Sequence, residues 1–426
     1  MFTEEKKNSQ ISQDFDNVYK PVDEIETSNF IKEIYKKNLP TEIVGTNTKN
    51  FIGNKLQCAK VLDLSRLSGI VEYLPEELYI KVKACTPISL IEEFLENNNQ
   101  QLAFEPIDFG YLNDSKSNKG TAAGQLSCNF SGSRRFKVGS LRDHILGFRG
   151  VNGKGDIIKS GGTVVKNVTG YDLSKLVTGS FGTLTALTEI TFKVLPKKDS
   201  ISTLVIYSED NKVITDLFDQ LLSSSNEISG AVYIPVEPNN KNYTKNIEKI
   251  FKLNNLKSEE PFVAVRIEGS KKSIDERIQD ISQELQTNKM KTSILDFYQS
   301  KLFWEKVNNL ELFSGIKNNL LRAVIPPAES LNLMKYLKNN FKYYIDWCGS
   351  LFWIEVLEEE NIQIKAMKET IINLGGYLTI VKKSESLSSD IDLFTINDTR
   401  LLLSQKIKES FDPKKLLNPG KMYRDL

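Results

Sequence analysis

The residue pattern with the clearest chemical potential is a concentration of glycine. Thirteen of the 24 glycines fall between Gly120 and Pro196, under a fifth of the chain. Glycine permits positive φ angles and close approach of the backbone to a ligand, so a cofactor is expected to touch main chain here. Gly179 and Gly182 flank Ser180 in a short turn whose amides could bind phosphate or ring oxygens. This block predicts a cofactor cradle, and ordinary strand turns are the competing interpretation.

Short polar and basic side chains accompany these glycines. Asn167 and Thr169 precede the sequence Gly170-Tyr171-Asp172, and two small-residue stretches lie upstream, at 120–124 and 131–135. The second stretch ends in Arg134 and Arg135. Guanidinium groups bind phosphates and carboxylates through two parallel hydrogen bonds, so this pair could neutralise a pyrophosphate or a substrate carboxylate. A solvated basic turn explains the two arginines equally well.

The scarcity of histidine and cysteine excludes several common kinds of metal site. His144 is the only histidine, and the four cysteines lie far apart without a Cys-x-x-Cys pair. These counts exclude histidine-based zinc sites and disfavour an iron–sulfur cluster, so no metal site is predicted. His144 lies in an amphipathic stretch and is predicted to be structural. No Gly-x-Gly-x-x-Gly follows a strand, and the glycines at 150–155 predict a hairpin turn rather than a P-loop.

The bulk composition is that of a globular protein, with 40% hydrophobic and 26% charged residues. The 56 basic and 55 acidic side chains nearly cancel, which argues against a nucleic-acid partner. No apolar run approaches the ~20 residues that cross a bilayer, and residues 1–20 lack the apolar core of a signal peptide. We therefore expect a cytoplasmic protein, with peripheral association to the inner membrane only through a partner.

Alternating strands and helices must position these residues. Apolar spacing predicts helices at 29–38, 88–97 and 173–177, and strands at 42–44, 60–64, 79–84 and 185–195. The hairpin joins strands 145–149 and 156–159, while the hydrophilic segment 108–119 predicts a surface loop. Beyond residue 200, strands at 203–207, 231–234, 262–268, 320–325 and 351–356 alternate with helices at 212–222, 273–285, 328–337 and 361–374. The predicted divisions are an arm at 1–25, domains at 26–198 and 199–399, and a C-terminal segment at 400–426.

Four motifs resemble those of a known family. They are GSLRDHILG at 139–147, KNVTGYDL at 166–173, GSFGTL at 179–184 and NPGKM at 418–422. Together they resemble the FAD-binding domain of the vanillyl-alcohol-oxidase/PCMH superfamily, and within it the small FAD-binding subunits of bacterial glycolate oxidases. The strong match covers roughly residues 100–196 and the last 20.

The resemblance implies an α+β fold, with a PCMH-type two-part FAD-binding domain, an α+β cap and a C-terminal tail that returns to the FAD-binding domain. It also implies an FAD cofactor lying between the domain and the cap. The positions that match the family's cofactor-binding segments are Gly45, Thr46, Asn47, Thr48, Pro106, Thr121, Gly124, Ser131, Asn167, Gly170, Tyr171, Gly179, Ser180, Gly182, Thr183, Ile190 and Asn418.

The chain departs from the family pattern in three places. Only Gly45 remains in a first loop that usually carries several glycines, and Thr185 and Tyr377 stand where glycine and histidine are usual. Because the first loop contains neither histidine nor cysteine for covalent attachment, non-covalent FAD is expected.

The resemblance implies oxidation of a 2-hydroxy acid, glycolate to glyoxylate, by hydride transfer to flavin. Arg134, Arg135, Arg266 and Arg322 are the candidates for the substrate carboxylate, and the catalytic base is not identified, although Tyr171 was considered. The implied partners are a larger homologous FAD subunit and an iron–sulfur subunit. Two alternatives stay open: a catalytically silent flavoprotein subunit that stabilises a catalytic homologue or relays its electrons, and a stand-alone FAD oxidase of an alcohol or sugar.

Overall fold

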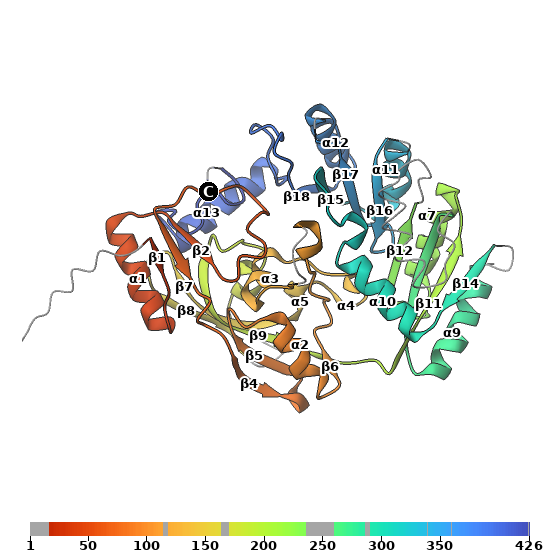
Figure 1. The fold of residues 1–426 in the computed structure, drawn as a ribbon, viewed down its shortest axis with the longest axis horizontal. Helices are drawn as coiled ribbons and strands as arrows, with labels where there is room; N and C mark the ends of the chain where they lie inside the picture. Colours follow the sequence, from red (N-terminus) through yellow and green to blue (C-terminus); the bar gives the residue numbers. More distant parts are fainter. Residues whose placement is uncertain are drawn as a thin grey trace, which may run out of the picture.

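The chain folds into two lobes that lie side by side (Figure 1). The computed structural model describes residues 17–113, 118–162, 170–235, 260–285, 290–338, 340–358, 360–424 and 426. The first lobe contains the described residues of 17–196 and the C-terminal segment from 398, and the second lobe contains those of 200–382. The chain therefore passes between the two lobes twice, from the first to the second near residue 198 and back again between residues 382 and 398.

The first lobe is built on two sheets. A parallel sheet has the order β1 (Val18–Tyr19), β3 (Lys60–Asp63), β2 (Thr41–Val44). An antiparallel sheet has the order β4 (Ile70–Leu74), β5 (Tyr79–Lys83), β9 (Thr185–Lys193), β7 (Ile145–Asn152), β8 (Ile157–Gly161). A short pair joins β6 (Gln100–Gln101) to β10 (Leu195–Pro196). This arrangement brings β5 and β9, which lie about a hundred residues apart in sequence, to the centre of one sheet.

Helices cover these sheets through apolar faces. Helix α1 (Glu24–Lys37) begins at Asp23, whose side chain accepts from the Glu26 amide, and packs its Phe30 and Ile31 against β3 and β7. Helix α2 (Ile88–Glu96) and the short helices α3 (Ala122–Cys128), α4 (Arg135–Val138), α5 (Leu141–His144) and α6 (Leu173–Val177) complete the lobe. Ile88 and Ile91 of α2 are completely buried against Val82 and Phe192 of the five-stranded sheet. Burial of these side chains supplies the main stabilisation of the lobe.

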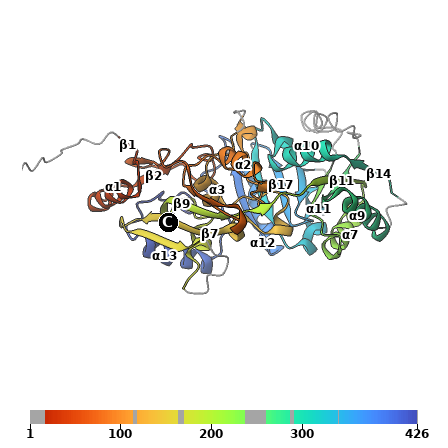
Figure 2. The ribbon, with the colours of Figure 1, turned by 90° about the horizontal axis from the view of Figure 1, so that it is seen from below.

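The second lobe is an eight-stranded antiparallel sheet, counted over the described residues. Its order is β14 (Thr292–Leu295), β11 (Ser200–Tyr207), β13 (Phe262–Gly269), β12 (Gly230–Ile234), β16 (Lys342–Asp346), β17 (Leu351–Val356), β15 (Asn319–Val324), β18 (Tyr377–Lys382). Helix α10 (Phe297–Asn308) lies on one face, and α7 (Asn211–Ser223), α9 (Lys271–Glu284) and α12 (Asn361–Asn373) lie on the other (Figure 2). Helix α11 (Ser330–Leu337) packs against α7.

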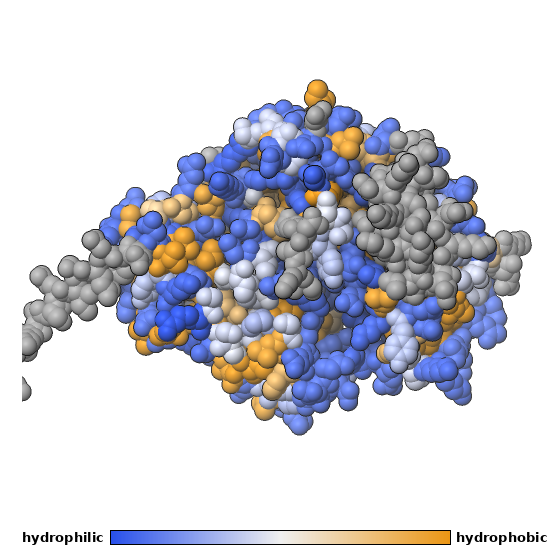
Figure 3. Space-filling model, viewed as in Figure 1, coloured by the Kyte–Doolittle hydropathy of each residue, from blue (hydrophilic) through white to orange (hydrophobic). Residues whose placement is uncertain are grey.

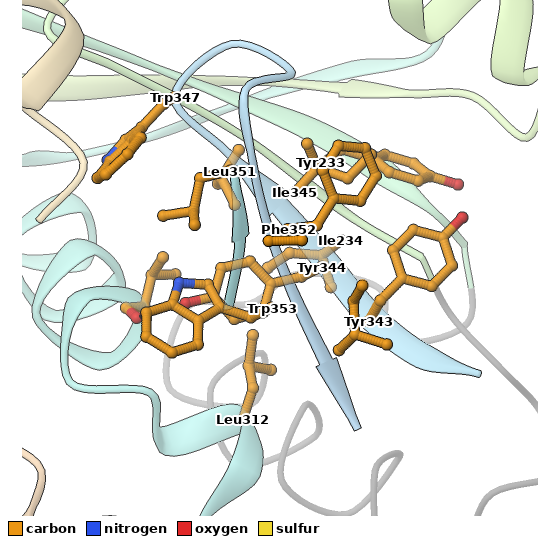
Figure 4. Packing of buried hydrophobic residues seen from close by; sticks show 14 of the residues in the cluster. Tyr233, Ile234, Leu312, Tyr343, Tyr344, Ile345, Trp347, Leu351, Phe352 and Trp353 are labelled. Atoms are coloured by element: carbon orange, nitrogen blue, oxygen red, sulfur yellow. The ribbon is translucent and has the colours of Figure 1, made fainter. Parts of the chain in front are cut away.

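Strands buried on both faces form the core of this lobe. All five residues of β12 are buried, and Figure 4 shows Tyr343 and Tyr344 of β16 beside Phe352 and Trp353 of β17. Phe109 and Phe130 of the first lobe belong to the same apolar cluster, so the core continues across the junction of the lobes. The outer surface in Figure 3 is largely hydrophilic with separate apolar patches. Within the described ranges, no helix has both the length and the hydropathy needed to cross a membrane.

The predicted elements are confirmed, with a few additions. Each predicted helix and strand corresponds to an element within a few residues of its predicted ends. The sequence did not predict β1, β4, β6, α3, α4, α5, α10, β14, β16 or β18. The prediction of a surface loop at 108–119 was wrong over its first part: Asp108, Phe109 and Leu112 are buried, because this segment lies between the lobes and includes a 3-10 turn at Gly110–Asn113. The Asp108 amide donates to the Asn309 side chain of the second lobe at 3.2 Å.

The C-terminal segment returns to the first lobe. After α13 (Asp398–Phe411), the Thr41 amide donates to the Leu416 carbonyl at 2.7 Å, and the Asn418 amide donates to the Thr41 carbonyl at 3.0 Å. The Asn418 side chain accepts from the Ile43 amide at 2.7 Å and donates to the Phe181 carbonyl at 2.8 Å. One side chain thereby joins the end of the chain to β2 and to the glycine turn at 179–183.

Replacing Asn418 with alanine should destabilise the first lobe by about 2–4 kcal/mol, because a buried main-chain donor and a buried acceptor lose their partners. Urea unfolding measured by circular dichroism tests this expectation. Asn373→Ala is the matched control, since Asn373 is exposed on α12. Equal midpoints for the two variants would contradict the bridging role of Asn418.

Candidate cofactor site and lobe junction

A cleft of about 130 Å³ lies in the first lobe where three distant segments meet. The segments are the loop after β2, the start of α3 and the C-terminal NPGKM sequence. Of the predicted cofactor positions, those lining the cleft are Gly45, Thr46, Asn47, Thr48, Thr121, Gly124, Gly182 and Asn418. The structure thus brings together residues that the sequence analysis grouped only by resemblance.

Gly120 allows these segments to approach closely. A Cβ on Gly120, whose φ is +76°, would lie 2.5 Å from Thr48 Oγ1 and 2.7 Å from Lys49 Nζ. At Gly182, whose φ is +71°, a Cβ would lie 2.7 Å from Asn418 Nδ2. Larger residues at either position would separate the walls of the cleft. Asn47 has a φ of 60°, a conformation that asparagine tolerates better than most residues, so the first loop keeps a left-handed residue despite its loss of glycines.

Two buried ammonium groups line the same cleft. Lys49 is 9% exposed and its Nζ donates to the Lys119 carbonyl at 2.8 Å. Lys421 is 8% exposed and its Nζ donates to the Asn50 carbonyl at 2.9 Å. Burial lowers the pKa of both lysines. The charges of Cys128 and of nearby acidic groups raise it, but by less than burial lowers it. Neither residue was among the predicted cofactor positions.

The glycine turn at 179–183 uses part of its backbone internally. The Gly179 amide donates to the Leu126 carbonyl at 3.0 Å, and the Phe181 amide donates to the Ser127 carbonyl at 2.9 Å. The expectation of a free amide at Gly179 was therefore wrong, because the turn is fixed to the end of α3. Gly179, Ser180 and Thr183 line a second cleft of about 160 Å³, whose other wall includes Ile407 and Tyr423.

The remaining predicted positions lie elsewhere. Pro106 and Ser131 are buried near the lobe junction, and Ser131 Oγ accepts from the Leu141 amide at 3.0 Å. Ile190 is completely buried in the middle of β9. Gly170 and Tyr171 are exposed, with Tyr171 at 93%, and Asn167 lies outside the described residues.

An ion cluster joins the two lobes. Arg266 of β13 donates from Nη1 to Glu105 Oε1 at 2.7 Å and from Nη2 to the Ser229 carbonyl at 2.7 Å. Arg134 donates from Nε to Glu268 Oε2 at 2.9 Å, and its Nη1 lies 3.2 Å from Glu105 Oε1. Burial would raise the pKa of both carboxyl groups, but the arginine charges outweigh it and hold the pKa of Glu268 at about 2 and that of Glu105 below its usual range. These two arginines are neutralised within the protein.

Arg135 and Arg322 have a different environment. Their guanidinium carbons lie 4.2 Å and 5.0 Å from the ring centroid of Trp347. Among the described residues, no carboxylate lies within ion-pair distance of either one. Burial lowers the pKa of Arg322, the Tyr377 side chain opposes this, and the charge of Arg135 adds to it. Arg135 belongs to the first lobe and Arg322 to β15 of the second, so two uncompensated cations meet at the junction.

The turn that carries Trp347 has an unusual backbone. Trp347, Cys348 and Gly349 have successive φ angles of 52°, 50° and 93°. A bulky residue with positive φ is a conformational outlier that the surrounding structure must hold in place. Here the Trp347 Nε1 donates to the Gly132 carbonyl of the first lobe at 3.0 Å, and the Trp347 amide donates to Asp346 Oδ1 at 2.6 Å.

Asp346 connects this turn to the first lobe. Its Oδ2 accepts from Ser133 Oγ at 2.7 Å. Burial raises the pKa of Asp346 to about 7, although the hydrogen bonds from Ser133 and the Trp347 amide oppose the shift. Its carboxyl group therefore titrates near neutral pH.

His144 is structural. It is 2% exposed, its Nε2 lies 3.0 Å from the Val138 carbonyl, and its ring lies 5.9 Å from that of Phe104. Burial lowers its pKa, so the ring is neutral at physiological pH. Within the described ranges, no three histidine, cysteine, aspartate or glutamate side chains gather as metal ligands would.

The comparisons with known proteins identify the first lobe. A family model described as "FAD binding domain" matches residues 15–161. The first lobe therefore resembles this FAD-binding domain over residues 15–161. Its cofactor is FAD, and the cleft fits such a group because buried cations, hydroxyl groups and a tight glycine wall converge there.

Two curated relatives resemble the FAD-binding chain over most of its length. Glycolate oxidase subunit GlcE of Escherichia coli is 28% identical over 398 residues, which are 93% of this chain and 96% of the relative. Glycolate oxidase subunit GlcD of Bacillus subtilis is 26% identical and covers 71% of this chain and 68% of its own. A solved p-cresol methylhydroxylase shares the fold, with a TM-score of 0.71, 15% identity, and coverage of 96% of this chain and 88% of its own.

Replacing Asp346 with asparagine should stabilise the FAD-binding chain at pH 8 and have little effect near pH 4. The folded state raises the pKa of this acid, so its stability falls as the pH rises from the ordinary aspartate value through about 7. Asparagine keeps both contacts, since its oxygen accepts from Trp347 and its amide donates to Ser133 Oγ. The melting temperature should rise by about 2–4 °C for each kcal/mol of relieved penalty.

Thermal melts at several pH values test this expectation. Asp390→Asn is the control, because Asp390 is a surface residue with an exposed ion pair to Lys365. A constant difference between Asp346→Asn and the parent across the pH range would show that the carboxyl group does not titrate as expected.

Proposed function

We propose that this chain is the FAD-carrying subunit of a complex that oxidises a 2-hydroxy acid, with glycolate converted to glyoxylate. The likeness to GlcE over nearly the full length supports the subunit role. The observation that favours a carboxylate substrate is the pair Arg135 and Arg322, which face Trp347 without an acidic partner among the described residues.

The arginines divide into two groups by their partners. Arg134 and Arg266 are occupied by Glu105 and Glu268, which leaves little positive charge for a substrate. Arg135 and Arg322 come from different lobes and bring uncompensated charge to one place, and planar guanidinium groups match a carboxylate in shape and charge. A 2-hydroxy acid held there would be fixed by its carboxylate, which leaves its hydroxyl-bearing carbon to be oriented toward the cofactor.

Bound FAD supplies the acceptor for the hydride, and the protein supplies position and charge. Trp347 provides a flat apolar surface that both guanidinium groups contact. Tyr377 lies beside Arg322 and is 39% exposed, so we assign its hydroxyl as a hydrogen-bonding partner of the substrate hydroxyl group. The alternative candidate Tyr171 is almost fully exposed on the first lobe and touches no arginine of this group.

A second candidate function is the catalytically silent subunit. The position of His144 favours it, because the one imidazole in the chain is buried against Phe104 and Val138. In that case the FAD-binding chain would support a larger homologous FAD subunit, to which the similarity with GlcD points, and an iron–sulfur subunit. The four separate cysteines of this chain would not hold such a cluster. We place the complex in the cytoplasm, with contact to the inner membrane only through a partner.

Replacing Arg322 with glutamine should raise the glycolate concentration that half-reduces the flavin by about 10–100-fold, since a charge-assisted hydrogen bond contributes ~1.5–3 kcal/mol. Arg135→Gln should act in the same direction. Anaerobic bleaching of the flavin band by glycolate, measured on the complex and on the chain alone, gives this concentration. Arg142→Gln is the control, because Arg142 is exposed and its guanidinium group donates to the Lys175 carbonyl at 3.0 Å, away from Trp347.

Ethylene glycol, which has an alcohol group but no carboxylate, distinguishes a role of the arginines in substrate binding from a role in maintaining the structure. The arginine variants should lose response to glycolate while their weak response to ethylene glycol stays constant. An equal loss for both alcohols would assign the arginines a structural role. Bleaching by the complex but not by the chain alone, with no effect of either arginine variant, would establish the silent-subunit alternative.

A further inference from the structure

We propose that Lys49 and Lys421 bind the pyrophosphate of FAD as a pair of buried cations, in the role that a glycine-rich loop plays elsewhere in the superfamily. The proposal rests on FAD as the cofactor and deepens it by naming the side chains that hold its charged part. Lys421 lies more than 370 residues from Lys49 in sequence, and the fold brings both to one cleft.

Both lysines line the cleft, and Lys421 supports the loop that contains Lys49. Lys49 extends beneath Gly120, where the missing side chain leaves room for its ammonium group. Lys421 Nζ donates to the Asn50 and Asn54 carbonyls at 2.9 and 3.4 Å, and so holds the loop that contains Lys49. Cys128 lies within the field of both ammonium groups, whose charges oppose the rise of its thiol pKa to about 11. Cys128, Lys49 and Lys421 all line the same cleft.

The charge balance of the cleft calls for an anion. The partners that Lys49 and Lys421 have in the described residues are neutral carbonyl groups, which satisfy hydrogen bonding but not charge. An ammonium group without an ion-paired carboxylate is costly to bury, and burial lowers the pKa of each lysine. Asp108 opposes this lowering for Lys49, and Glu42, which also lines the cleft, opposes it for Lys421, but neither carboxylate is ion-paired with its lysine in the described residues. By contrast, buried Lys408 has its own carboxylate, Asp412, at 2.8 Å. A pyrophosphate, with a negative charge on each phosphate, would supply what Lys49 and Lys421 lack.

The thinned first loop fits this assignment. Family members place several glycine amides against the phosphates, whereas here the loop reads Gly45-Thr46-Asn47-Thr48-Lys49. Lysine is an established phosphate ligand that acts as a point charge. The hydroxyl groups of Thr46 and Thr48 also line the cleft and add neutral donors. The loop keeps its main-chain amides, and the lysines add charge where fewer glycines leave the backbone less room to approach a phosphate.

The experiment compares Lys49→Gln, Lys421→Gln and the control Lys55→Gln, whose lysine is exposed on the same loop. The affinities of the apo chain for FAD, ADP and riboflavin are measured by flavin fluorescence quenching and by calorimetry. Each cleft variant should weaken FAD and ADP at least about 10-fold, which corresponds to a lost charged contact of ~1.4 kcal/mol. Riboflavin, which has no phosphate, should bind every variant equally.

A second readout excludes a merely structural role. Removal of an uncompensated buried charge should leave the melting temperature of the apo chain unchanged or higher, while the increase caused by added FAD becomes smaller. A lower apo melting temperature with an unchanged FAD increment would overturn the proposal. So would equal weakening of FAD and riboflavin.

Two further measurements keep the test decisive. If a glutamine variant fails to fold, the pH dependence of the parent replaces it: affinity for FAD should decrease toward alkaline pH, below the usual lysine range, while affinity for riboflavin stays constant. If the chain binds no flavin, inorganic pyrophosphate is used as the probe. Lysine-dependent binding of pyrophosphate would then support the anion site while the FAD-based function fails, and its absence would reject both.

Discussion

The ion cluster of Glu105, Arg134, Arg266 and Glu268 is the interaction on which the arrangement of the lobes depends. Each member bonds across the junction or supports one that does, and all are largely removed from water. Charges in such surroundings are tolerable only as a complete set, since one missing partner leaves the others uncompensated. The cluster therefore fixes how the second lobe sits on the first, and with it the meeting of Arg135, Trp347 and Arg322. Asp346 and Ser133 extend the same contact toward that turn.

The buried cations of this protein differ in what neutralises them, and that difference separates structure from ligand binding. Arg134, Arg266 and Lys408 have carboxylate partners within the chain. Among the described residues, Lys49 and Lys421 in the cleft donate to carbonyl groups, and Arg322 at the junction lies against aromatic rings. Burial of Lys49, Lys421 and Arg322 would cost least free energy if each of them contacted the negative charge of a bound ligand. A chain that serves FAD and a carboxylate substrate needs two such places, one for a pyrophosphate and one for a carboxylate.

Most of the fold was predictable from sequence because its strands and helices have clear apolar periodicity. The glycine block and the NPGKM motif also indicated which segments form the cofactor site. The partners of individual side chains were not predictable: nothing local distinguishes Arg134, which is neutralised, from Arg135, which is not. The segment at 108–119 was assigned to the surface because its composition is polar, but the main-chain groups of Asp108 and Leu112 bond to side chains of the second lobe. The buried state of Lys421 depends on the loop at 50–54, far away in sequence.

The two candidate binding places are built by different parts of the protein, so they respond to different constraints. The cleft is contained in the first lobe and is closed by the C-terminal segment through Asn418 and Lys421. The arginine pair exists only when the lobes are joined, because its members come from both. On the proposed assignment, cofactor binding would require the C-terminal segment in place, whereas substrate binding would require the ion cluster as well. A subunit that had lost catalysis could lose the arginine pair and keep the cofactor cleft. Arg135 and Arg322 are both present and have no acidic partner among the described residues, which favours a chain that still binds a carboxylate.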